Sequence, residues 1–211
     1  LMRSSAASDV YKRQVLSVLV LEDIVRDVRG GIIHNYPLVK IGTQYWMRDN
    51  LEASSYVGGE ALPRLDAVTA NVVGYLQSTA EHYFYTANVV LSNKILPAHW
   101  SIPDWKDWNI LKDYLNGEAS LLKSGTWLPL KAGEQVQPAT NLSGFNGIPV
   151  GMYVGAFQTD YEKKHLAYWT LDNANAAIDI KVFYLKSDTD IIEESNAGVD
   201  TKAFAIRCIR K

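Results

Sequence analysis

The chain has 211 residues, 47% of them apolar, and carries a formal net charge of −2 at pH 7. This composition is typical of a globular protein, and the length allows one large domain with a sizeable core. Because it has no broad basic surface, the chain is not expected to bind nucleic acid. Because no apolar run reaches roughly 18 residues, it is not expected to span a membrane directly.

Three regions are predicted along the chain. Residues 1–14, LMRSSAASDVYKRQ, are polar without a period and are predicted to be a disordered or non-native leader. Residues 15–37 are predicted to be a strand-like N-terminal extension, with Gly30-Gly31 as a turn signal. The apolar run at 15–21 is interpreted as a strand, since acidic residues follow it where the cleavage site of a signal peptide would lie. Residues 38–211 are predicted to form the main domain.

The main domain opens with two short β-prone runs. Residues 38–41 and 44–47 are separated by Gly42-Thr43, and a glycine-containing pair between two such runs predicts a hairpin. Residues 54–80 have no firm period and are predicted to be a loop with one short helix near 67–76. No internal repeat and no low-complexity tract is apparent.

The clearest helix signal lies in IPDWKDWNILKDYLNG. Asp104 is placed to cap the first turn, and Asp107 stands three residues later, where a capping box has an acidic residue. Gly117 is a suitable terminator. These signals predict a helix over 104–116.

Three tryptophans lie in or just before this helix. Trp108, Leu111 and Leu115 recur at helical spacing, so they share one apolar face. Trp100 precedes the helix, whereas Trp105 lies off the apolar stripe and is expected to be half exposed. A tryptophan buries on the order of 200 Å², so we interpret Trp100 and Trp108 as core anchors rather than as a binding platform.

The last third of the chain is predicted to be strand-rich after a turn-rich segment at 128–165. Strands are predicted at 165–171, 177–186 and 203–211. In the second of these, Ile178 and Ile180 alternate with polar residues, which is typical of a half-buried strand.

Motifs of catalysis are missing from the sequence. The four histidines are scattered without metal-binding spacing, and neither a nucleophile elbow nor a glycine-rich phosphate loop occurs. The acidic segment at 188–194 lacks the spacing of a calcium loop and is interpreted as a solvated turn. The chain is therefore not expected to be an enzyme, and no cofactor, metal or catalytic residue is predicted.

Seven segments occur in an order that resembles a known family. They are VKIGTQYWMRDNL (39–51), YFYTAN (83–88), LPAHWSIPDWKDWNIL (96–111), LLKSGTW (121–127), TNLSGFNGIPVG (140–151), AYWT (167–170) and FAIRCIRK (204–211). Together they resemble the Fibrobacter succinogenes major paralogous domain, over residues 38–211.

The resemblance implies a fold, a setting and a role. The implied fold is α+β and C-type-lectin-like, with short antiparallel sheets, one or two helices, a long loop region, and paired N- and C-terminal strands. The implied setting is the exterior or cell surface of Bacteroidetes or Fibrobacteres, as a secreted protein or lipoprotein. No established activity comes with the family, so a non-catalytic adhesion module that binds polysaccharide or a surface protein is the leading hypothesis. A structural or assembly domain is the alternative, and an uncharacterised enzyme is the third.

Two sets of residues carry these hypotheses. The predicted core consists of Trp46, Trp100, Trp108, Leu111, Phe145, Trp169 and Cys208. The predicted ligand surface is the irregular segment 128–165, where Tyr153, Phe157 and Tyr161 are candidates for stacking on sugar rings. Ordinary loop packing is the alternative explanation for the same three side chains.

The sequence departs from the family at one disulfide. The family usually has a cysteine where this chain has Leu96, and its natural partner is the cysteine near the C-terminus, here Cys208. Loss of such a bridge removes about 2–5 kcal/mol of stability, part of which apolar contacts of Leu96 would restore. The triplets that hold calcium in sugar-binding C-type lectins are incomplete at 136–140 and 168–173, so no calcium site is carried over.

Overall fold

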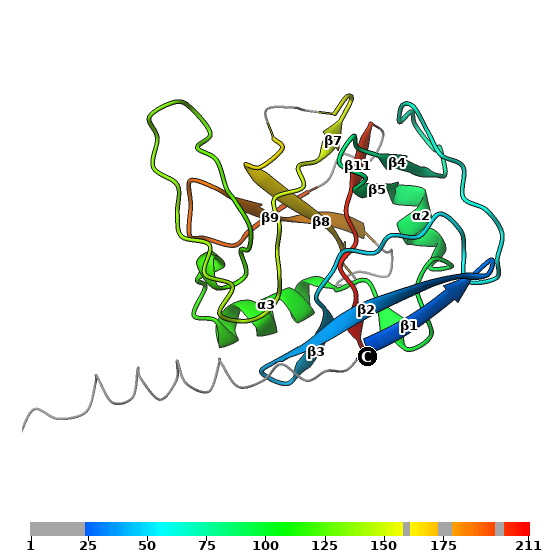
Figure 1. Ribbon diagram of the computed structural model, residues 1–211, viewed down its shortest axis with the longest axis horizontal. Helices are drawn as coiled ribbons and strands as arrows, with labels where there is room; N and C mark the ends of the chain where they lie inside the picture. The colour runs from blue at the N-terminus through cyan, green and yellow to red at the C-terminus, as the bar shows by residue number, and fades with distance from the viewer. Residues whose placement is uncertain (1–23, 158–160, 173–178, 197–200) are drawn as a thin grey trace, which may run out of the picture.

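The computed structural model describes residues 24–157, 161–172, 179–196 and 201–211. These residues form mostly β structure with two short α-helices (Figure 1). The strands are β1 (Ile24–Arg29), β2 (Ile32–Ile41), β3 (Gln44–Met47), β4 (Tyr75–Gln77), β5 (Tyr83–Thr86), β6 (Trp100–Ser101), β7 (Tyr153–Val154), β8 (His165–Asp172), β9 (Asp179–Lys186), β10 (Glu193–Asn196), β11 (Lys202–Phe204) and β12 (Ile209–Arg210). The helices are α2 (Ala87–Ser92), α3 (Trp105–Tyr114) and the single 3₁₀ turn η1 (Ala119–Leu121). The predicted leader and the run at 15–21 lie outside the described residues.

The strands form three sheets whose neighbours all pair antiparallel. The orders are β1-β2-β3-β12-β6, β4-β5-β11-β7 and β10-β9-β8. The predicted pairing of the two ends of the domain is confirmed, because Ile209 of β12 lies opposite Trp46 of β3. The amide of Met47 also donates to the carbonyl of Cys208 at 3.0 Å, so the end of the chain is fixed to its beginning.

Two glycine turns set the register at the N-terminal side of the fold. Gly30 and Gly31 both have positive φ, 55° and 83°, which suits the tight turn between β1 and β2. The hairpin predicted around Gly42-Thr43 is confirmed, with Ile41 opposite Gln44. Strand β2 begins at Ile32, inside the predicted N-terminal extension, and continues across position 38 without a break.

The predicted helix near 104–116 is confirmed as α3. The carboxylate of Asp104 accepts from the amides of Lys106 and Asp107, and the Asp107 carboxylate accepts from the Asp104 amide at 2.8 Å, which completes the capping box. Trp108 and Leu111 are the buried residues of this helix, whereas Trp105 is half-buried. The helix ends at Tyr114, before two residues of positive φ, Asn116 and Gly117.

Two local predictions are wrong. The expected helix near 67–76 is absent. The segment forms a turn and then enters β4, whose residues Tyr75 and Gln77 pair with β5. The expected single strand at 203–211 is divided into β11 and β12, which belong to different sheets. Between them the chain crosses from one sheet to the other, as the red C-terminal segment of Figure 1 shows.

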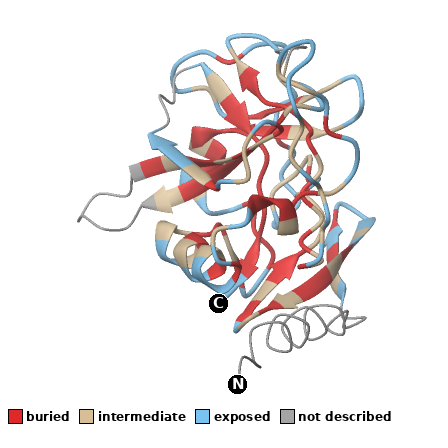
Figure 2. Cartoon of the chain, turned by 90° about the vertical axis from the view of Figure 1, so that its left-hand side faces the viewer, coloured by how far each residue is buried: buried red, intermediate tan, exposed pale blue. Residues whose placement is uncertain are grey.

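The buried residues gather on the strands and on the inner face of α3 (Figure 2). The seven side chains expected in the core, Trp46, Trp100, Trp108, Leu111, Phe145, Trp169 and Cys208, are all buried. Trp108 is central, since its ring stacks on Phe183 at 3.7 Å between centroids and contacts Trp46 at 4.8 Å. Its indole nitrogen donates to Thr170 Oγ1 at 2.7 Å, so the buried polar atom is satisfied.

The acidic segment at 188–194 is more than the solvated turn that was predicted. Asp190 Oδ2 accepts from the hydroxyl of Ser120 at 3.1 Å, and a second bond joins Asp190 to the Ser120 amide. Lys123 is buried beside it and donates to the carbonyl of Thr189 at 2.6 Å. This segment therefore holds η1 against the end of β9.

Candidate functional site

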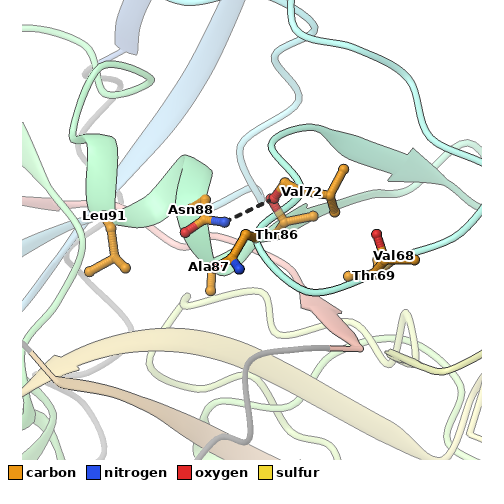
Figure 3. Close-up of a pocket in the computed structure, with 8 residues that line it drawn as sticks. Val68, Thr69, Val72, Thr86, Ala87, Asn88 and Leu91 are labelled. Atoms are coloured by element: carbon orange, nitrogen blue, oxygen red, sulfur yellow. Dashed lines mark hydrogen bonds between the residues drawn. The ribbon is translucent and has the colours of Figure 1, made fainter.

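A shallow pocket with a cavity volume of about 40 Å³, open to solvent on one side, lies at the start of α2 (Figure 3). One wall is the loop before β4, and the other is the end of β5 together with α2. The lining residues are Val68, Thr69, Asn71, Val72, Thr86, Ala87, Asn88 and Leu91. We call this the α2 pocket.

Hydrogen bonds hold the two walls together. Asn88 Nδ2 donates to the carbonyl of Val72 at 3.2 Å, the bond drawn in Figure 3. The amide of Gly74 donates to Thr86 Oγ1 at 3.3 Å. The loop wall is itself closed by a bond from the Val72 amide to the Thr69 carbonyl at 3.3 Å. The pocket is therefore formed by ordered backbone before any ligand is present.

The side chains that line the pocket are uncharged. Among the residues that the structure describes, those lining the pocket are aliphatic, hydroxyl or amide side chains, and none is titratable. Hydroxyls and amides both donate and accept hydrogen bonds, so the pocket suits a ligand that does the same. It offers no group for acid–base or nucleophilic catalysis.

The three predicted ligand-binding aromatics divide into two places. Tyr153 is 3% exposed, and its hydroxyl donates to the Gly155 carbonyl at 3.1 Å. The amide of Val68, in the pocket wall, donates to the same hydroxyl at 3.4 Å. Phe157 is 39% exposed and packs edge-on against Tyr153, with 5.2 Å between ring centroids. Tyr161 packs instead on His165, at 4.6 Å.

The three positions differ in how well they support the prediction that these aromatic rings stack on a sugar. Tyr153 is buried too deeply to stack on a sugar, and its role in the structure is to support the pocket wall. Phe157 also packs on Phe84, at 5.5 Å, and Phe84 lies two residues before the lining residue Thr86. Phe157 is therefore connected to the α2 pocket through Phe84 and Tyr153 without lining it, whereas Tyr161 packs on His165.

The pocket residues were not predicted from the sequence, although a signal exists. The pentapeptide TANVV occurs twice, at 69–73 and 86–90. This short repeat escapes an inspection for longer repeats. Six of the lining residues belong to the two copies, and the other two, Val68 and Leu91, directly flank them.

Strongly perturbed titratable groups lie in the interior rather than at the pocket. Burial, together with the neighbouring Lys186, lowers the pKa of His165 to about 4. Burial also lowers the pKa of Lys123, and it raises the pKa of the Cys208 thiol to about 12. Each of these shifts has burial as its largest cause, which is typical of core positions.

In the described parts of the chain, no group of three or more His, Cys, Asp or Glu side chains is arranged to hold a metal ion. Likewise, none of the described helices has the length and apolar character needed to cross a membrane.

Comparison with known proteins gives one result. No curated protein and no solved structure matches this chain. A family model, however, matches residues 39–210, which is most of the sequence and includes the α2 pocket and the paired terminal strands β3 and β12. The chain therefore belongs to the family of the Fibrobacter succinogenes major domain.

Proposed function

We propose that this domain is a non-catalytic binding module of the cell exterior, and that it holds a glycan in the α2 pocket. The observation that carries the proposal is the combination of hydroxyl and amide side chains in the pocket with the partly exposed ring of Phe157, which packs on the Tyr153 that supports the pocket wall. Sugars present hydroxyls at their edges and C–H groups on their faces. Such a ligand is matched by hydrogen-bonding groups and an aromatic ring.

The proposal includes a C-type-lectin-like fold and a location outside the cell, on the surface or secreted. The support for the fold is the pairing of β3 with β12, together with the long stretch between η1 and β7 that lacks named strands or helices. The support for the location is the family resemblance. The support for a binding role over a catalytic one is the lack of titratable side chains among the described lining residues.

A glycan array followed by affinity electrophoresis in soluble polysaccharides tests the proposal. We expect Phe157→Ala to weaken binding strongly, because it removes the exposed ring. Leu142→Ala is the matched control, since Leu142 is comparably exposed but lies in the loop before Phe145. Tyr161→Ala tests whether Tyr161, the remaining predicted aromatic, contributes to binding. Binding that survives Phe157→Ala unchanged would contradict the α2 pocket as the site.

One observation favours the alternative, an assembly domain. Strand β1 lies at the edge of its sheet, and Val28 faces Ile33 across the β1–β2 hairpin. Both side chains are about half exposed, as are Ile24 and Ile32 on the same hairpin. Exposed aliphatic groups next to an open sheet edge favour association. A strictly monomeric protein in size-exclusion chromatography with light scattering would count against this alternative.

A further inference from the structure

The two TANVV copies meet at one pocket in different conformations. The first copy is a turn in which Asn71 has φ of 63°, in the left-handed region that asparagine tolerates. The second copy begins at the last residue of β5 and forms the first turn of α2. Identical residues therefore supply a threonine and an asparagine to each of the two walls.

The second copy uses part of its polar capacity for the framework. Asn88 donates through Nδ2 to Val72, which leaves its Oδ1 atom as an acceptor. Thr86 is 2% exposed and accepts from the Gly74 amide, so it fixes the wall rather than meeting a ligand. Asn88 is thereby oriented before binding, which lowers the entropy lost when a ligand is held.

The first copy is free to bind. Within the described part of the chain, the side chains of Thr69 and Asn71 make no hydrogen bond, and both residues are exposed. Across the pocket lie the aliphatic side chains of Ala87 and Leu91. A ligand there meets free hydroxyl and amide groups on one wall and an oriented amide next to an apolar surface on the other.

Charge decides the class of ligand. No lysine or arginine is among the described lining residues, so a carboxylate or sulfate brought into the pocket would lose water without gaining an ion pair. A neutral sugar exchanges hydroxyl–water bonds for bonds to Thr69, Asn71 and Asn88, with no charge to desolvate. We infer that the α2 pocket is specific for an uncharged polysaccharide, bound by Thr69 and Asn71 of the first TANVV copy and by Asn88 of the second.

This inference rests on the proposed function, and matched polysaccharides distinguish the two. Affinity electrophoresis would compare hydroxyethyl cellulose with carboxymethyl cellulose, and dextran with dextran sulfate, at one ionic strength. We expect retardation by at least one neutral member and little by its anionic counterpart. An anionic polysaccharide could instead retard the protein as much as its neutral counterpart or more, and Phe157→Ala could abolish that retardation. This result would overturn the inference that the ligand is uncharged, but it would leave the pocket's binding function intact. Failure to bind any of the four would count against the binding function itself.

A single charge placed in the pocket completes the test. Asn71→Asp changes an amide to a carboxylate at a left-handed position that aspartate tolerates, and we expect it to weaken neutral polysaccharide binding by roughly ten-fold or more. Asn116→Asp is the matched control, because Asn116 is exposed, has φ of 52° and lies after α3, away from the pocket. Equal binding by the two variants would overturn the role of the TANVV residues.

Discussion

The guanidinium of Arg207 donates through Nη2 to the hydroxyl of Tyr168 at 2.8 Å, and both side chains are fully buried. No carboxylate is among the described hydrogen-bond partners of Arg207. Its other bonds go to Asn50 Oδ1 and to the carbonyls of Met47, Arg48, Phe145 and Asn146. Those to Met47 and Phe145 are 2.9 and 2.7 Å long, and the guanidinium lies 4.5 Å from the Phe145 ring centroid. One cation thus joins the segment after β3, the loop around Phe145, and β8 to the C-terminal crossover.

Removing this guanidinium should destabilise the domain strongly. Arg207→Ala leaves several buried carbonyls without a donor, and each unsatisfied group costs about 1–3 kcal/mol, so we expect a loss of about 3 kcal/mol or more. Urea unfolding followed by tryptophan fluorescence measures it. Arg210→Ala, three residues on at an exposed position, should change stability by no more than about 0.5 kcal/mol. Similar losses in both variants would show that Arg207 is not a structural anchor.

Gly74 should tolerate no side chain. An added Cβ would lie 2.5 Å from the carbonyl oxygen of Pro63 and 2.8 Å from Leu65 Cγ, and the first of these is backbone that cannot move aside cheaply. Gly74→Ala is therefore expected to cost about 1–3 kcal/mol, and to weaken the proposed glycan binding because Gly74 also bonds Thr86 in the pocket wall. Gly58→Ala is the control, since nothing lies within 4 Å of its Cβ position. Thermal unfolding that ranks the two variants equally would contradict the clash.

Restoring the family cysteine at position 96 tests whether this position lies within disulfide reach of Cys208. Leu96 and Cys208 belong to the same buried cluster, and the family resemblance places a cysteine at 96. Leu96→Cys is expected to form a disulfide with Cys208 and to add about 2–4 kcal/mol of stability. Because burial raises the pKa of Cys208 to about 12, the bond should form during oxidative refolding rather than in the folded protein. Two titratable thiols in the refolded, denatured variant would contradict this pairing.

What the sequence could predict depended on how local the information was. The capping box of α3 lies within four residues, and the stripe of Trp108 and Leu111 lies on one helix, so both are readable from neighbours. The glycine turn between β2 and β3 is equally local. The pairing of Trp46 with Ile209 is not local, and the family resemblance supplied it.

The errors arose where partners distant in the sequence decide the conformation. Residues 205–208 resemble a continuation of the strand, but they cross between sheets. The Trp169 amide donates to the carbonyl of Ala205, and the Met47 amide donates to the carbonyl of Cys208. Arg207 resembles the outward residue of a strand, and only carbonyls from other segments make its burial favourable. The α2 pocket likewise needs β4 and β5 to pair before the two TANVV copies meet.

His165 gives the chain a specific acid sensitivity. Its side chain is buried, and among the described residues its Nδ1 atom has no hydrogen-bond partner. Its pKa is lowered from 6.5 to about 4, chiefly by burial and also by Lys186 and Lys164, whereas Asp188 and Glu193 oppose the shift. Because the pKa is lower in the folded state, the unfolded chain binds the proton more readily. The stability due to neutral His165 is complete above about pH 6.5 and is lost as the pH falls toward 4.

Replacing the imidazole should remove this part of the pH dependence. In His165→Asn, the free energy of unfolding should fall less steeply between about pH 6.5 and 4 than in the wild type. His99→Asn is the control: His99 is exposed with φ of 68°, a conformation that asparagine accepts, so its curve should keep the wild-type slope. Urea titrations at half-unit pH steps give the slopes. The slope of the free energy of unfolding against pH depends only on the difference in bound protons between the folded and unfolded chains. Parallel curves for the wild type and His165→Asn would therefore mean that protonation of His165 does not limit stability in acid.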